Sequence, residues 1–235
     1  MTDRRVIAIT GTRSGIGRHL AGHYCDRGFL VEGCSRGPSS FTHPNYRHAQ
    51  LDVADEMSVR DFFASVRKTH GRLDALVNNA AQIAVNNVLV TPLSQMQDIF
   101  RTNFMGVFLC CREAVKVMMR NRGGRIVNFT SIAVPLAPVG TAAYGSSKAA
   151  VEQFTRVLAA ETAATGISAY SLSLSMVQDS GMAAAMSADA ARDAVERSTL
   201  KRWLTLDEVA GAVDALLDGN GGVASGETIS LGGAA

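Results

Sequence analysis

Two side chains, Tyr144 and Lys148, have the types and the spacing that proton transfer requires. At positions i and i+4 of a helix they lie on one face, roughly 5–6 Å apart at their Cβ atoms. A nearby ammonium favours phenolate and lowers the pKa of a tyrosine from its ordinary value of about 10. The pair therefore predicts a tyrosine that acts as acid or base near neutral pH, although either residue alone is more often a packing or solvated side chain.

Two further polar residues, Ser131 and Asn103, extend this pattern. Ser131 ends an apolar run that reads as a strand, and its hydroxyl can donate to a carbonyl oxygen there. Asn103 interrupts the apolar face of a predicted helix, where a buried amide needs hydrogen-bond partners. Each has an ordinary structural explanation, but all four together are difficult to attribute to packing alone.

A glycine-rich turn with Gly11, Gly15 and Gly17 joins the first predicted strand to the first predicted helix. Glycines permit a tight turn and let the backbone approach a pyrophosphate, which the helix N-terminus attracts through its N–H groups and dipole. The spacing GxxxGxG differs from the GxGxxG of the common dinucleotide fingerprint. Its strand–turn–helix context nevertheless favours nucleotide binding over simple chain reversal.

The elements that must position these residues alternate between short apolar runs and longer helical segments. We expect strands at residues 6–9, 29–34, 47–51, 73–77, 125–129, 167–174 and 228–231. We expect helices at residues 16–27, 55–70, 94–120, 142–164 and 207–217. The alternation predicts an α/β fold: a single doubly wound Rossmann-type domain over residues 1–235, with a parallel sheet of about seven strands. Such sheets bind ligands at the carboxyl ends of their strands.

Composition excludes several classes of protein. A chain of 235 residues leaves little room for a separate substrate domain, and 47% hydrophobic residues argue against disorder. The net charge of +2, without a block of like charges, gives no support for nucleic-acid binding. The apolar runs fall short of the roughly 20 residues of a membrane span.

Neither the four cysteines nor the five histidines show metal-ligand spacing, so we expect no metal site. Without a signal-peptide pattern, we expect a cytoplasmic protein.

The motifs resemble those of the short-chain dehydrogenase/reductase family over nearly the full chain. The matching residues are Thr10, Gly11, Gly15, Ile16, Gly17, Leu51, Asp52, Val53, Asn78, Asn79, Ala80, Ala81, Asn103, Ser131, Tyr144 and Lys148. The resemblance implies an enzyme that transfers a hydride between a nicotinamide cofactor and a carbonyl or alcohol carbon of a small molecule.

The resemblance also implies roles for several of these residues. Asp52 and Val53 would line the adenine, and Asn79 would brace the cofactor-side strand. Tyr144 would donate or accept the proton, and Ser131 would position and polarise the substrate carbonyl. Lys148 would bind the nicotinamide ribose and lower the Tyr144 pKa, and Asn103 would hold a water in a proton relay. The residues expected at the cofactor are Gly11, Arg13, Ser14, Gly15, Ile16, Gly17, Ser35, Arg36, Asp52, Val53, Asn79, Ala80, Ala81, Tyr144, Lys148, Val177 and Ser180.

The end of the second predicted strand indicates which cofactor is preferred. An acid at this place binds the 2′-hydroxyl of NAD, but here the residues are Ser35 and Arg36. Loss of the carboxylate removes repulsion, and Arg36 can bind a 2′-phosphate in bidentate fashion, with Arg13 as a second charge. We therefore expect NADP(H), with NAD(H) as the alternative.

One segment departs from the family pattern. The usual Pro-Gly after the sixth strand is replaced by Ser175 and Met176, while Ser180 stands for a threonine that contacts the cofactor. The substrate lid is expected at about residues 175–200. The expected pocket wall is small and mostly apolar, which suits a neutral or moderately polar carbonyl compound. It comprises Gln82, Ile83, Ile132, Ala133, Val134, Pro135 and Leu136.

Three functions are compatible with this pattern. An NADP(H)-dependent carbonyl reductase or alcohol dehydrogenase for a free small molecule ranks slightly above a 3-oxoacyl-carrier-protein reductase. Arg120, Arg122 and Arg125 provide bases before the fifth strand, but the corresponding place before the sixth strand, at residues 164–166, has none. A non-catalytic NADP(H)-binding sensor or scaffold is the third. The resemblance also implies a homotetramer, with a dimer second.

Overall fold

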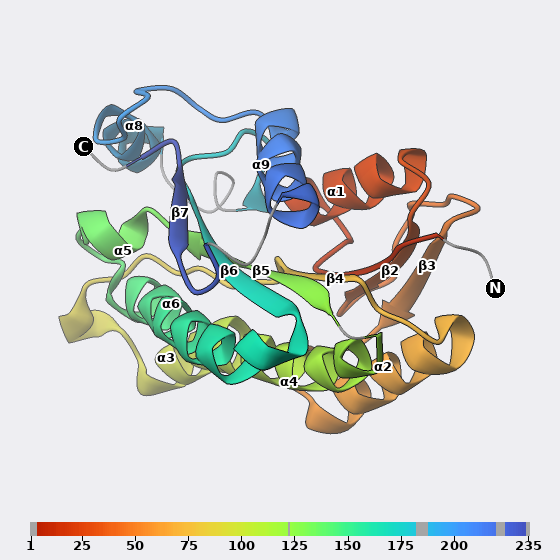
Figure 1. Cartoon of the computed structure of the whole chain (residues 1–235). Helices are drawn as coiled ribbons and strands as arrows, with labels where there is room; N and C mark the ends of the chain where they lie inside the picture. Colours follow the sequence, from red (N-terminus) through yellow and green to blue (C-terminus); the bar gives the residue numbers. More distant parts are fainter. Residues whose placement is uncertain (1–3, 122, 182–187, 220–223, 234–235) are drawn as a thin grey trace.

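The computed structural model describes residues 4–121, 123–181, 188–219 and 224–233, in which seven parallel strands form one sheet (Figure 1). The strands are β1 (Val6–Thr10), β2 (Leu30–Ser35), β3 (Tyr46–Gln50), β4 (Ala75–Asn78), β5 (Gly124–Ser131), β6 (Ile167–Leu174) and β7 (Thr228–Leu231). They pair in the order β3-β2-β1-β4-β5-β6-β7. The predicted α/β fold with a parallel sheet is confirmed, and the expected strand ends agree within two residues.

The central strands are buried on both faces of the sheet. Every residue of β1, β4 and β6 is buried, as the continuous apolar runs predicted. β1 pairs with β2 on one side, Ile7 opposite Val31, and with β4 on the other, Ile9 opposite Val77. The strand order therefore reverses at β1, which is where doubly wound sheets bind ligands.

Helices cover both faces of this sheet (Figure 1). α1 (Gly15–Asp26) and α9 (Leu206–Asp218) pack together on one face. The other face carries α2 (Glu56–His70), α4 (Gly106–Met118) and α6 (Ala142–Thr162). The remaining helices of the described residues are α3 (Leu93–Phe100), α5 (Ala133–Leu136) and α8 (Ala188–Glu196). Across the described ranges, no helix has the length and apolarity to cross a membrane.

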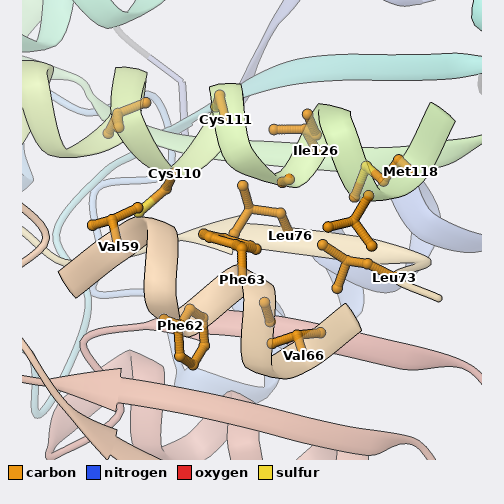
Figure 2. Packing of buried hydrophobic residues seen from close by; sticks show 14 of the residues in the cluster. Val59, Phe62, Phe63, Val66, Leu73, Leu76, Cys110, Cys111, Met118 and Ile126 are labelled. Atoms are coloured by element: carbon orange, nitrogen blue, oxygen red, sulfur yellow. The ribbon is translucent and has the colours of Figure 1, made fainter. Parts of the chain in front are cut away.

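The larger hydrophobic core lies between the sheet and the helices α2 and α4. Figure 2 shows Phe63 of α2 facing Leu76 of β4 and Cys111 of α4, and all three side chains are fully buried. The local sequence sets the ends of α2: the Asp55 carboxylate accepts a hydrogen bond from Ser58 N at 2.7 Å, and Gly71 ends the helix at φ 73°. The amphipathic pattern thus predicted both the face and the limits of this helix.

The expected continuous helix at residues 94–120 is wrong in its middle. α3 ends at Phe100, a π-helical turn occupies Arg101–Met105, and α4 begins at Gly106. The Gly106 N–H donates to the carbonyl of Arg101, so one residue more than in an α-helical turn is accommodated. Asn103 of this turn is fully buried.

The short helices α5 and α8 were not predicted. In α8, Ala191, Ala194 and Val195 pack against Met176 and Trp203, which lie outside the helix in the segments before and after it. A short stretch of small residues gives little periodic signal, so these tertiary contacts decide its conformation. Part of the expected lid, residues 182–187, lies outside the described residues.

Candidate active site

The turn between β1 and α1 has a geometry that requires glycine. Gly11 and Gly15 have positive φ angles of 77° and 54°, a region that other residues rarely adopt. A Cβ on Gly17 would lie 2.3 Å from the Gly11 carbonyl oxygen and 2.5 Å from Nδ2 of Asn79. The three glycines predicted from the sequence therefore do shape this turn.

The start of α1 faces a cavity at the carboxyl ends of the strands. Ser14 occupies the N-cap position but makes no side-chain hydrogen bond to the first turn of the helix. Ser14, Gly15 and Ile16 all line the cavity. The positive end of the helix dipole thus points to a space that an anion can enter.

This cavity has a volume of about 530 Å³ and contains most of the residues predicted to bind the cofactor. The predicted residues in its wall are Gly11, Arg13, Ser14, Gly15, Ile16, Ser35, Arg36, Asp52, Val53, Asn79, Ala80, Ala81, Tyr144, Lys148, Val177 and Ser180. Gly17 is not part of the wall because it packs beneath the turn. The structure therefore brings together residues that are spread over 170 positions of the chain.

A threonine at the end of β1 holds the neighbouring strand β4 in place, and sequence reasoning did not assign it a role. The hydroxyl oxygen of Thr10 accepts hydrogen bonds from the backbone N–H groups of Asn79 and Ala80, both at 3.0 Å. Nδ2 of Asn79 donates in return to the Thr10 carbonyl at 2.8 Å. The residues after β4 are thereby fixed against the glycine turn, and the bracing role expected of Asn79 agrees with these contacts.

Ser131, Tyr144 and Lys148 meet where β5 ends and α6 begins. Tyr144 and Lys148 line the cavity, and the Ser131 hydroxyl is near enough to act on the pKa of Tyr144. Lys148 Nζ donates to the backbone carbonyl of Phe129 at 2.9 Å and lies 5.9 Å from the centre of the Tyr144 ring. The helical i, i+4 spacing has thus placed the phenol and the ammonium beside one cavity.

The pKa of Tyr144 differs from the sequence expectation. Burial raises the pKa of Tyr144 to about 12, against an opposing effect of the hydrogen bond with Ser131. Burial also lowers the pKa of Lys148 to about 8. The expected lowering of the Tyr144 pKa by Lys148 is therefore wrong for this state of the protein, because desolvation dominates and the ammonium is bound to Phe129. A neutral phenol is the form that can donate a proton to a carbonyl oxygen.

Asn103 connects the loop after β4 to helix α6. Its Oδ1 accepts from the backbone N–H of Gln82 at 2.7 Å, while Nδ2 donates to the Gln82 carbonyl at 2.9 Å and to Ser147 Oγ at 3.0 Å. The side chain is fully buried and its polar atoms are all bonded to protein groups. These contacts give Asn103 a bracing role, and its part in a proton relay stays a prediction.

Two arginines lie at the end of the cavity near β2. With the Gln82 amide oriented so that its nitrogen donates to Thr102 Oγ1 at 2.9 Å, its oxygen accepts from Arg36 Nη1 at 3.3 Å. Arg36 therefore reaches across the cavity to the loop after β4. The guanidinium of Arg13 packs over Gly37, so both predicted cations are present at this end.

The segment that replaces the expected Pro-Gly is anchored to its surroundings. Met176 is 2% exposed, its carbonyl accepts from Leu204 N at 2.8 Å, and Gln178 N donates to the Leu204 carbonyl at 2.9 Å. Ser175, Val177 and Ser180 line the cavity. The segment that replaces the expected Pro-Gly therefore still forms part of the wall of the predicted cofactor site.

Comparisons with known proteins agree with this geometry. The family described as short chain dehydrogenase matches residues 5–191. The chain is 28% identical over 237 residues to the 3-oxoacyl-[acyl-carrier-protein] reductase FabG of Salmonella typhimurium, covering 98% of this chain and 97% of that protein. It is 32% identical over 252 residues to a short-chain type dehydrogenase/reductase of Picea abies, covering 97% and 91%. The solved structure of ElxO with NADP bound has a TM-score of 0.87 and 26% identity, and the match covers 97% of this chain and 96% of that one.

Proposed function

Because the chain belongs to the short-chain dehydrogenase family, we propose that it is an NADP(H)-dependent oxidoreductase that interconverts a carbonyl compound and a secondary alcohol. The observation that carries this proposal is that Tyr144 and Lys148 line the same cavity as the glycine turn. A proton-transferring side chain and a dinucleotide-binding turn are the two parts that such a reaction needs.

The residues of the cavity fit a nicotinamide dinucleotide. A volume of about 530 Å³ is within the roughly 300–1,000 Å³ of small-molecule sites, and the glycine turn leaves its backbone open to a pyrophosphate. When bound, this cofactor supplies or accepts the hydride. We assign the pyrophosphate to the turn from Gly11 to Ile16, the adenine to Asp52 and Val53, and the nicotinamide ribose to Lys148.

The protein side of the reaction is the movement of one proton. Tyr144 donates it to the substrate oxygen during carbonyl reduction and accepts it during alcohol oxidation. Ser131 positions and polarises the same oxygen. A Tyr144 pKa of about 12 keeps the phenol protonated at neutral pH, which is the form that carbonyl reduction needs.

The preference for NADP(H) rests on the end of the cavity that holds Arg13, Ser35 and Arg36. Two guanidinium groups and a hydroxyl form a set of donors for a 2′-phosphate, without a carboxylate at the Ser35 position. The NADP-bound structure of ElxO supports this assignment by similarity.

Of the residues expected in the pocket wall, Gln82 and Ile83 line the cavity, whereas Ala133 and Val134 line a second pocket. The incomplete set of bases at the expected carrier-docking surface favours a free ketone or secondary alcohol as substrate. The names of the FabG relatives favour a second candidate, the reduction of a 3-oxoacyl group on an acyl carrier protein. Arg120, exposed at the end of α4, would be a base for docking an acidic carrier, whereas Arg125 is half-buried and donates to the Gly124 carbonyl. Arg122 lies outside the described residues. We rank the free small molecule first.

We further propose a homotetramer, with a dimer as the smaller alternative, in the cytoplasm. Met105, Phe108 and Val157, from the π-helical turn, α4 and α6, expose 51%, 41% and 45% of their surface, which is more apolar area than a helix face in water usually shows. All four cysteines are free thiols, which suits a reducing compartment.

The proposed reaction is tested by NADPH oxidation with a panel of free ketones and with a 3-oxoacyl thioester on an acyl carrier protein. Turnover of the thioester alone would reverse our ranking of substrates. Tyr144→Phe should reduce turnover by about 10²–10⁴-fold, while the affinity for NADPH stays unchanged in a titration without substrate. Full activity of Tyr144→Phe would refute its role as acid and base. NADPH binding by the wild type without turnover of any compound would favour a sensor or scaffold.

A further inference from the structure

A half-buried histidine on the edge strand β3 joins two loops at the Arg36 end of the cavity. Nδ1 of His48 lies 2.8 Å from the hydroxyl of Tyr46 and 3.4 Å from Thr12 Oγ1 in the glycine turn. Nε2 of the same ring lies 3.1 Å from Ser35 Oγ and 3.1 Å from the carbonyl oxygen of Gly37. Both ring nitrogens thus have partners, one in each loop.

The partners determine where the neutral ring carries its proton. The Gly37 carbonyl can only accept, so Nε2 of His48 donates to it. Nδ1 is then the acceptor, and the hydroxyl groups within its reach are those of Tyr46 at 2.8 Å and Thr12 at 3.4 Å. Hydrogen bonds at both ring nitrogens therefore fix the orientation of the imidazole between β2 and the glycine turn.

The space for this arrangement is provided by a glycine in β2. A Cβ on Gly33 would lie 2.5 Å from the Tyr46 hydroxyl oxygen and 2.6 Å from Thr12 Oγ1, which are themselves 2.8 Å apart. Any larger residue would displace the hydroxyl group that orients the imidazole. The sequence of β2 thus accommodates the hydrogen bonds of His48.

Ser35 shares an acceptor with His48. Its hydroxyl donates its only proton to the Gly37 carbonyl at 2.8 Å, so this carbonyl receives two donors for its two lone pairs. If Ser35 turns its proton toward an anion, Gly37 still keeps the bond from His48. The cost of leaving a carbonyl without a partner is thereby avoided.

We propose that His48 is a positioning residue that selects for the 2′-phosphate of the cofactor. It keeps the Gly37 carbonyl bonded, which frees the Ser35 hydroxyl to donate to that phosphate and fixes the turn from which Arg36 projects. Ser35, Arg36 and Gly37 line the cavity, and His48 acts on the cofactor only through them. The proposal rests on the NADP(H) preference proposed above.

The test is a set of dissociation constants for NADPH and NADH, measured by titration without substrate. His48→Phe should weaken NADPH binding by at least about tenfold and change NADH binding less than about twofold. Ser35→Ala should give the same selective loss, and the double variant should be no weaker than either single variant. His48→Gln, which can still donate to Gly37, should retain most of the preference.

His43→Phe is the matched control, because its ring contacts Asn45 and Asp26 rather than Ser35. It should change neither constant. Equal losses for NADPH and NADH, additive effects in the double variant, or a Ser35→Ala variant that binds NADPH like the wild type would each overturn the inference. If His48→Phe does not fold, Ser35→Ala and His48→Gln still decide the question. If the wild type binds NADH as tightly as NADPH, the proposed preference for NADP(H) is refuted, and with it the proposed role of His48 in selecting the 2′-phosphate.

Discussion

Replacing Asn103 by alanine should destabilise the whole fold and not only the reaction. The side chain makes three hydrogen bonds, at 2.7, 2.9 and 3.0 Å, and is fully buried. The substitution leaves the N–H and the carbonyl of Gln82 without their partner and removes one bond of Ser147. Each buried group left unpaired costs about 1–3 kcal/mol. For the two Gln82 groups together, we expect the free energy of unfolding to fall by about 2–6 kcal/mol.

The assay is urea unfolding followed by circular dichroism, in which a lower midpoint at unchanged slope reports a loss of stability. Asn86→Ala is the control, because that amide is exposed and bonds to Gln95 on the surface. It should shift the free energy of unfolding by less than about 0.5 kcal/mol. An Asn103→Ala variant with the wild-type midpoint and a large loss of turnover would refute the bracing role and favour the proton relay instead.

Three further predictions follow from the cavity. Arg36→Ala should raise the dissociation constant for NADPH by about 10–100-fold and leave that for NADH nearly unchanged; equal effects on both would contradict a 2′-phosphate contact. Burial lowers the Lys148 pKa from 10.5 to about 8. Between these two pH values the folded chain therefore binds fewer protons than the unfolded chain, so Lys148 makes the free energy of unfolding rise with pH in this range. Lys148→Met should flatten that rise in urea unfolding from pH 8 to 10.5; an unchanged slope would show that another group causes it. Gly17→Ala should abolish NADPH binding in titrations or lower the midpoint of thermal unfolding, because its Cβ would meet the Gly11 carbonyl at 2.3 Å.

The sequence predicted the sheet well because buried parallel strands leave a simple signal. The limits of β6 and β7 were predicted to the residue, and those of α2 within one residue. The glycine turn was also recognisable, since its positive φ angles restrict the residue type at Gly11 and Gly15. The helix ends and the glycine turn depend on contacts that are local in sequence, and the central strands are buried on both faces along their whole length.

The features that were missed depend on distant contacts. Apolar residues at spacings of three and four continue from Ile99 to Val107, so the pattern gave no sign of the π-helical turn between them. Thr10 directly follows the predicted strand 6–9, and only its bonds to Asn79 and Ala80 reveal its role.

The pairing rule for a lysine and a tyrosine predicted a lowered Tyr144 pKa. The rule considers only the charge of the ammonium and leaves out the desolvation of the phenolate, which raises the pKa. Here the site is buried, and Lys148 donates to the Phe129 carbonyl instead. The proximity of the two groups was predictable from the spacing, but the sign of the pKa shift needed the burial of both residues.

The π-helical turn at Arg101–Met105 has a consequence for how the length of this chain can change. Each residue removed from a regular α-helix rotates everything beyond it by about 100°, which would turn the buried faces of α3 and α4 out of register. A π turn already holds one surplus residue, so a deletion there restores ordinary helical bonding and leaves both flanks in place. A deletion of Asn103 would therefore keep the flanking helices α3 and α4 in register. Its cost would be the three hydrogen bonds that hold Gln82 and Ser147, so the same loss of stability is expected as for Asn103→Ala.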